Sequence, residues 1–209
     1  MESLPVKPPL PLLLLPVLAA PLPAALPGNI AAHLREAACV HLDFVQTRVL
    51  AALSRPLKAS GSMVLARGRG VIWALRRPLA ITYVMGPGGL LVVDADGRRE
   101  RKSARDAPLV AQVGRVFQAL AQGDWTALDS LFTVTGGGTP RRWQVELLPR
   151  PQAQSFVRRI RLDGGPFIDR VRVEEPAGDR MELTFSNQRV DLPLSPDEAA
   201  LLDQLPARD

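Results

Sequence analysis

The sequence has little of what disulfides and metal sites need. Its single cysteine, Cys39, excludes an internal disulfide. Arg35 and Glu36 stand where an acylated lipoprotein cysteine would be preceded by apolar residues, so we expect Cys39 to be a small buried residue. The two histidines, His33 and His41, are not accompanied by a pattern of carboxylates, and we therefore expect no metal site.

The motifs of common enzyme classes are missing as well. There is no Gly-x-Ser-x-Gly of a hydrolase, no Gly-Lys-Ser/Thr that cradles a phosphate and no dinucleotide fingerprint. The stretch Asp94-Ala95-Asp96-Gly97 resembles the start of a calcium loop, but it lacks the downstream glutamate and fits a hairpin turn. The sequence predicts a protein that is not an enzyme, and a lipid hydrolase is disfavoured because no nucleophile and base can be paired.

Aromatic residues are scarce, ten in all, and they are not interleaved with the basic residues. The net charge of +5 suits nucleic acid, an anionic membrane surface or an acidic protein partner, and charge alone does not choose among them. The most basic run, residues 98–102, contains Glu100 and has the pattern of a solvated hairpin arm, unlike a base-stacking platform. We expect no nucleic-acid partner.

A long uninterrupted apolar run is also lacking. The first 25 residues read MESLPVKPPLPLLLLPVLAAPLPAA, in which Pro11 and Pro16 break the apolar stretch and small residues follow it. Such a stretch is too short and too interrupted for a membrane-spanning helix and matches a secretory signal peptide, cleaved after Ala19 or Ala25. The sequence predicts export, with residues 1–25 as the signal peptide and residues 26–209 as one domain.

What the sequence does have is a series of short alternating segments joined by glycine, proline and aspartate turns. Helical patterns cover residues 29–42, with Asn29 as N-cap, and residues 108–132 and 196–205. Strands are expected from Asp43 to before Pro56 and at 60–67, 70–76, 79–85, 90–94, 98–102, 141–148, 155–163, 166–175 and 179–186, with residues 135–139 as a loose glycine loop. The predicted fold class is mainly β (α+β), with one antiparallel sheet of about ten strands.

Two of these strands, 60–67 and 70–76, are apolar on both faces. Met63, Leu65, Val71 and Trp73 share one parity, and Val64, Ala66, Ile72 and Ala74 share the other. A half-solvated strand would alternate apolar and polar residues, while a sheet of this size must curl and be covered by helices. We therefore expect an open, curled barrel with a helical lid that encloses an apolar cavity, and one face of these strands turned to the cavity or its lid.

Several short motifs follow one another in a familiar order. They are Phe44-Val45-Gln46, Gly61, Trp73 followed by Pro78, the hairpin Gly86–Gly89, Gly123-Asp124-Trp125 and Trp143–Pro149. Over about residues 30–190, this order resembles that of the LolA-type periplasmic lipoprotein carriers. The resemblance implies an open barrel with a helical lid and a periplasmic protein that uses no cofactor and catalyses nothing. It would carry acylated outer-membrane lipoproteins, with their acyl chains hidden in the cavity.

The resemblance also implies which residues form the site. The acyl-binding cavity would be lined by Phe44, Met63, Leu65, Val71, Trp73, Tyr83 and Phe117, with plain core packing as the alternative for each. In the family, an arginine on the second strand bonds to the lid and holds the empty cavity closed. A gap-free register from Gly61 to Trp73 gives Arg67 this latch position, with Arg77 in reserve, and the alternative is that Arg67 faces water at a strand end.

The implied partners are a cargo, which is an acylated lipoprotein or another lipid, and an inner-membrane release complex or transporter, with the carrier itself a monomer. Hand-off to an outer-membrane receptor stays open, because carriers that use one have an extra C-terminal strand and this chain ends in the helical pattern SPDEAALLDQLPARD. The alternative function is a non-catalytic structural or assembly protein of an outer-membrane or lipid-export pathway, whose barrel is filled.

Overall fold

The computed structural model describes residues 37–103, 105–106, 116, 119, 126–190 and 192–206. Three of the predictions therefore lie mostly or wholly outside the described residues. They are the signal peptide over residues 1–25, the first helix as far as residue 36, and most of the helical segment over residues 108–132, including Phe117.

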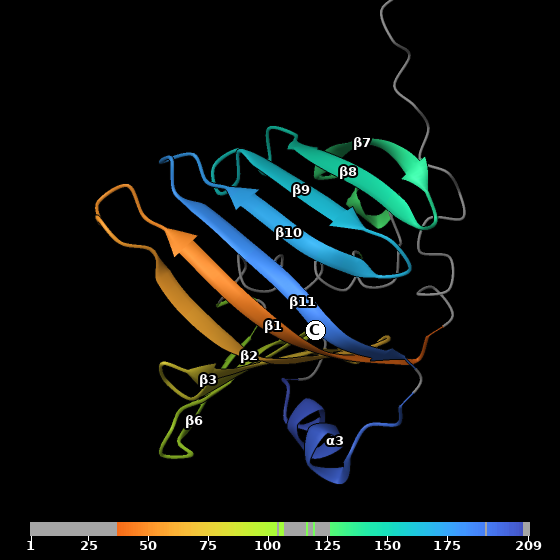
Figure 1. Ribbon diagram of the computed structural model, residues 1–209. Coiled ribbons are helices and arrows are strands. Elements are labelled where there is room, and N and C mark those ends of the chain that lie inside the picture. Colours follow the sequence, from red (N-terminus) through yellow and green to blue (C-terminus); the bar gives the residue numbers. More distant parts are fainter. Residues whose placement is uncertain are drawn as a thin grey trace, which may run out of the picture.

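Within the described residues, eleven strands form one antiparallel sheet in the order β6-β5-β4-β3-β2-β1-β11-β10-β9-β8-β7. Figure 1 shows this sheet curling from β7 and β8 at the top, through β11 and β1, to β3 and β6 at the bottom. The strands are β1 (Cys39–Val49), β2 (Leu57–Ala66), β3 (Gly70–Arg77), β4 (Ile81–Gly86), β5 (Gly89–Val93), β6 (Arg99–Ser103), β7 (Phe132–Thr139), β8 (Arg142–Pro149), β9 (Arg159–Gly164), β10 (Ile168–Glu174) and β11 (Arg180–Val190). The prediction of a mainly β, open and curled antiparallel sheet is confirmed, with eleven strands in place of about ten.

The eleventh strand contains the glycine stretch over residues 135–139, which is predicted to be a loose loop. This prediction is wrong, because residues 135–139 lie in β7 and pair with β8, Gly137 opposite Gln144 and Gly138 opposite Trp143. Ladder hydrogen bonds use backbone groups only, so a strand can form where side chains give no alternating signal. At Gly138, with φ of +127°, an added Cβ would lie 2.4 Å from the Arg142 carbonyl oxygen, so this close pairing needs glycine.

The predicted helix over residues 29–42 is wrong in its last turn. Residues 39–42 open β1, and their burial follows the two faces of a strand, with Val40 and Leu42 in one apolar cluster and Cys39 in another. The end of the predicted segment 108–132 also differs: Val116 and Ala119 are helical, but Thr126–Leu128 is a short 3₁₀ helix and Phe132 begins β7.

The two faces of the sheet belong to two different clusters. One face, called the inner face here, contributes Phe44, Met63, Val71 and their counterparts on β7–β11 to the main core, which Val116 and Ala119 join. The other, outer face of β2–β5 packs Val64, Ala66, Ile72, Val84 and Leu91 against Leu202 of the C-terminal helix α3 (Pro196–Asp203). Strands β2 and β3 are therefore apolar on both sides because α3 covers their outer face, while the side chains predicted to line the cavity, Met63, Leu65, Val71 and Trp73, lie on the inner face.

Polar contacts fix α3 against the sheet. Ser195 and Glu198 form a capping box at its start, and the same Glu198 carboxylate lies 3.2 Å from Nε2 of His41 on β1. At the other end, Arg69 donates to Asp203 at 2.5 Å and to the Ala199 carbonyl at 3.2 Å. The helix is thus attached at both ends as well as through its leucines, and Figure 1 shows it lying below the curled sheet.

The Glu198 contacts make the docking of α3 sensitive to acid. Burial alone would raise the pKa of Glu198, but hydrogen bonds from the Ser195 backbone, His41 and the Ser195 side chain together lower it below the ordinary 4.5. The carboxylate therefore stabilises the fold above pH 4.5, and this contribution is lost as the pH falls through the lowered pKa. We expect Glu198→Gln to lower the unfolding free energy by roughly 0.5–1 kcal/mol at neutral pH, with the difference shrinking at acid pH.

Urea unfolding at a series of pH values checks this expectation. The matched control is Asp197→Asn, which removes an exposed carboxylate from the same turn without touching the Ser195 or His41 contacts. A Glu198→Gln defect that persists unchanged at low pH would contradict the assignment.

Candidate functional site: the apolar inner face

The inner face of β1–β5 carries a row of apolar side chains that runs across the strands. The register aligns Leu42, Met63, Trp73, Tyr83 and Val92 on five successive strands. Neighbours across an antiparallel sheet stand close enough for their side chains to touch, so the row forms a continuous apolar surface.

Next to this row, Phe44 links the two halves of the sheet. It lies opposite Phe185 of β11 and opposite Gly61 of β2. Its ring meets the ring of Trp73 edge to face, with centroids 5.5 Å apart and an interplanar angle of 83°, an arrangement that aromatic pairs prefer. The missing side chain at Gly61 leaves Ala74 and Leu75 of β3 in close contact with the β2 backbone.

Six of the seven residues predicted for the cavity share this face. Phe44, Met63 and Val71 are at most 2% exposed, whereas Leu65, Trp73 and Tyr83 are partly exposed and pack against the same cluster. Phe117 lies outside the described residues. The strand periodicity thus brings the six described residues together, but only half of them offer surface to a ligand.

The partly exposed part of the face includes residues that the sequence analysis does not select. They are Leu75, Val92, Val173, Met181 and Phe185. Leu75 has the parity of Trp73 and could have been found from it. Phe185 joins the site only because β11 pairs with β1, which no local pattern in the sequence indicates.

The two latch candidates lie at opposite ends of β3. Arg67 is exposed in the β2–β3 turn, where its backbone N–H donates to the Ala38 carbonyl at 3.0 Å. Arg77 is the exposed last residue of β3, before the cis bond to Pro78. With about 3.3 Å per residue, the eight residues of β3 separate them by roughly 25 Å, so the two cannot serve the same end of the face.

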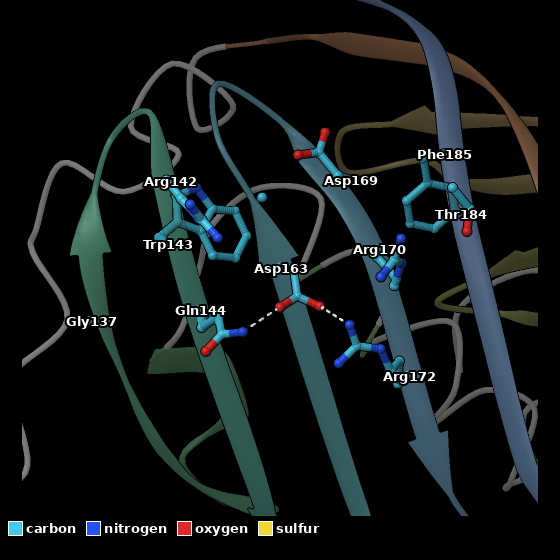
Figure 2. Close-up of a pocket in the computed structure, with 11 residues that line it drawn as sticks. Gly137, Arg142, Trp143, Gln144, Asp163, Asp169, Arg170, Arg172, Thr184 and Phe185 are labelled. Carbon is cyan, nitrogen blue, oxygen red and sulfur yellow. Dashed lines mark hydrogen bonds and ion pairs between the residues drawn. The ribbon is translucent and has the colours of Figure 1, made fainter.

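The outer face of β8–β11 is polar and contains a depression of about 830 Å³, continuous with a neighbouring one of about 540 Å³. Figure 2 shows Asp163 at its centre, accepting from Gln144 at 2.7 Å and paired with Arg172 at 3.0 Å. Arg172 also pairs with Glu182 at 3.2 Å. The charges are mutually compensated across four strands, so this depression is better explained as a ladder of strand-joining ion pairs than as a ligand site.

The described residues were also compared with the requirements of a metal site and of a membrane-spanning helix. Among them, no group of three or more histidine, cysteine, aspartate or glutamate side chains could hold a metal ion. In the same part of the chain, no helix is long and apolar enough to cross a membrane.

Comparison with known proteins identifies the family of the chain. It belongs to the family described as outer membrane lipoprotein carrier protein LolA-like, whose model matches residues 19–182. The resemblance found in the order of the short motifs is thereby confirmed. No curated protein sequence matches the chain.

The similar solved structures include proteins from three different bacteria. A LolA superfamily protein from Nitrosomonas europaea is 9% identical, with 78% of this chain and 93% of that chain covered and a TM-score of 0.42. A putative outer membrane lipoprotein-sorting protein domain from Vibrio parahaemolyticus is 10% identical, with 79% and 92% covered and a TM-score of 0.41. A chain of the MucA/MucB complex from Pseudomonas aeruginosa is 10% identical, with 80% and 56% covered and a TM-score of 0.42.

Proposed function

We propose that the protein is a periplasmic carrier that shields the acyl chains of a lipoprotein or another lipid on its way from the inner towards the outer membrane. The observation that carries the proposal is the partly exposed apolar surface of Trp73, Leu75, Tyr83 and Phe185 on a sheet of a lipoprotein-carrier family. Residues 1–25 serve as the export signal in this proposal and residues 26–209 as the carrier domain, a monomer loaded by an inner-membrane release complex or transporter.

The acyl chain would lie along the row formed by Trp73 and Tyr83, with Leu65 and Leu75 beside it. Transfer of an acyl chain from water to an apolar surface is favourable by about 0.8 kcal/mol per CH₂ group. A chain of ordinary lipoprotein length therefore binds measurably even when only part of it is covered.

The second candidate function has an observation of its own. Phe44, Met63 and Val71 are almost completely buried, as expected of core residues in a filled sheet. A non-catalytic structural or assembly protein would need nothing more. In the carrier proposal these three residues support the floor of the site, and the partly exposed residues contact the acyl chain.

Titration with a fluorescent fatty acid tests the proposal. We expect saturable binding to the wild type, weakened about fivefold by Leu75→Ser and by Tyr83→Ser, because each change removes roughly 1 kcal/mol of apolar contact from a half-buried position. The control is Val45→Ser, which trims an apolar residue that is 51% exposed on the outer face of β1. If the wild type does not bind the fatty acid either, the sheet is filled and the carrier proposal fails.

The same titration separates the two latch candidates. A latch that favours the closed, empty state competes with the acyl chain, so its removal tightens binding and slows release. In our proposal Arg67→Leu has this effect and Arg77→Leu, at the far end of β3, does not. Equal binding by Arg67→Leu and the wild type would remove Arg67 from this role.

A further inference from the structure

The chain segment between Asp43 and Asp94 carries charges of positive sign only. Between Asp43 and Asp94 the chain has no aspartate or glutamate, but it has seven basic residues: Arg48, Arg55, Lys58, Arg67, Arg69, Arg76 and Arg77. This stretch runs from β1 to β5. This stretch has a net charge of +7, whereas the rest of the chain has 19 basic and 21 acidic residues, so the net positive charge of the molecule is concentrated in it.

Four of these basic residues gather at one end of the sheet. Because β1 to β4 are successive antiparallel neighbours, the β1–β2 loop and the β3–β4 loop lie at the same end. Arg55 is in the first loop, Lys58 follows it in β2, and Arg76 and Arg77 end β3 just before the second loop. The first loop projects at the left of the sheet in Figure 1.

None of the four charges is neutralised by a carboxylate among the described residues. All four side chains are exposed, and the contact given for Arg76 is to the uncharged Ser62 hydroxyl at 3.1 Å. Arg48, the next basic residue along β1, differs because it pairs with Glu175 at 2.8 Å. Within the stretch from Asp43 to Asp94, these four cations at the tips of β1–β4 thus differ from Arg48 and Arg69, which pair with carboxylates.

Exposed leucines stand among these charges. Leu53 is 47% exposed, Leu57 is 49% exposed and Leu79, in the β3–β4 loop, is 67% exposed, the largest exposure among the large hydrophobic residues of the described chain. We call these three leucines, together with Arg55, Lys58, Arg76 and Arg77, the basic rim. The rim combines separate apolar side chains with cations, and the carboxylate that borders the β1–β2 loop, Asp179, accepts the Ala51 backbone N–H at 2.9 Å.

We propose that the basic rim docks on a bilayer surface that contains anionic lipid. Each lysine or arginine that reaches such a surface raises the affinity of the protein for the bilayer about fivefold, because its charge is attracted to the anionic lipid. Leucines at loop tips can enter the interface beneath the headgroups. A protein partner would need a shaped pocket for each leucine, whereas a bilayer accepts isolated apolar side chains wherever they project. The charge complementarity and the scattered leucines therefore favour lipid.

This inference goes beyond the carrier proposal and does not depend on it. The rim borders the part of the inner face where burial decreases along β3, from the fully buried Val71 to the partly exposed Trp73 and Leu75. Docking through the rim would turn that open end of the apolar face towards the membrane.

Flotation with lipid vesicles tests the proposal on the full mature chain. We expect binding to vesicles of phosphatidylcholine with phosphatidylglycerol, weaker binding at high salt, and little binding to phosphatidylcholine alone. The double variant Arg55→Gln/Lys58→Gln should weaken binding by about 25-fold, fivefold for each charge, and Leu79→Ser should weaken it as well.

Matched controls remove the same groups elsewhere on the sheet. Arg141→Gln/Arg142→Gln takes two exposed charges from the β7–β8 turn and the first residue of β8, and Leu148→Ser takes a leucine that is 37% exposed on β8. Both should bind vesicles like the wild type. Circular dichroism confirms that each variant folds, which is expected because every changed side chain is exposed.

The proposal is overturned if the wild type does not float with anionic vesicles, or if the rim variants and the control variants lose the same amount of binding. Fatty-acid binding is measured on the same variants. If fatty-acid binding is absent, the carrier proposal is refuted and the vesicle result is unaffected. If vesicle binding is absent while fatty-acid binding is intact, only the proposal that the basic rim docks on a bilayer is refuted.

Discussion

Replacing Trp143 with alanine is expected to lower the unfolding free energy by about 3–5 kcal/mol. The side chain is 2% exposed in the main core, and its indole N–H donates to the Gly165 carbonyl at 2.7 Å. The ring also fills the space above Gly164, where an added Cβ would lie 2.5 Å from Trp143 Cζ2. The substitution therefore leaves a cavity and an unpaired carbonyl at once.

Urea unfolding followed by circular dichroism measures this loss. Trp143→Phe keeps most of the ring and loses the hydrogen bond, so it should cost only about 1–2 kcal/mol. Arg142→Ala, at an exposed position of the same strand, should be close to neutral. If Trp143→Ala is no worse than Trp143→Phe, the ring does not fill the core as the structure shows.

The second large effect is expected at Gly61. An added Cβ would lie 1.9 Å from the Ala74 carbonyl oxygen, which belongs to the backbone and cannot rotate away. Gly61 also follows the irregularity in the β2–β3 register at Ser60. Gly61→Val should therefore cost about 3 kcal/mol or more, or prevent folding, because β3 would have to separate from β2.

Gly178→Ala is the control for this change. Gly178 has φ of +91°, but nothing lies within 4 Å of its added Cβ, so only the backbone strain of about 1 kcal/mol remains. Comparable losses at the two positions would mean that crowding at β3 is not the reason for glycine at position 61. Thermal unfolding of both variants, or expression yield if one does not fold, makes the comparison.

Local patterns predict the hairpins of this fold well. The strands expected at 70–76 and 141–148 correspond to β3 and β8 within one residue at each end, because alternation and turn residues act over neighbouring positions. Local patterns could not reveal β7, because its glycines carry no side-chain signal. They also could not reveal the first residues of β1, because the pattern of these residues also fits a helix. The C-terminal helix was expected, but its place on the outer face was not, because Leu202 meets Ile72 across 130 residues of chain.

The candidate site could likewise be predicted from the sequence only in part. Parity alone brings Met63, Trp73 and Tyr83 to one face, since they lie on adjacent hairpin strands. How much of each side chain is covered depends on elements distant in sequence, so the almost complete burial of Phe44 and Val71 could not be predicted. The sequence register leaves open which of Arg67 and Arg77 takes the latch position. The bounds of β3 place the two arginines at its opposite ends.

The pairing of β1 with β11 has a consequence for how the chain is made. Strands β2–β6 and β7–β10 can each stack as hairpins, but the two groups join only through β1 and β11, the first and last strands in sequence. During synthesis from the N-terminus, β1 keeps one edge without a neighbour until Arg180–Val190 has emerged. Such long-range closure makes folding slow and leaves an unpaired edge open to aggregation. A nascent chain of this design needs protection from aggregation until nearly all of it has been synthesised.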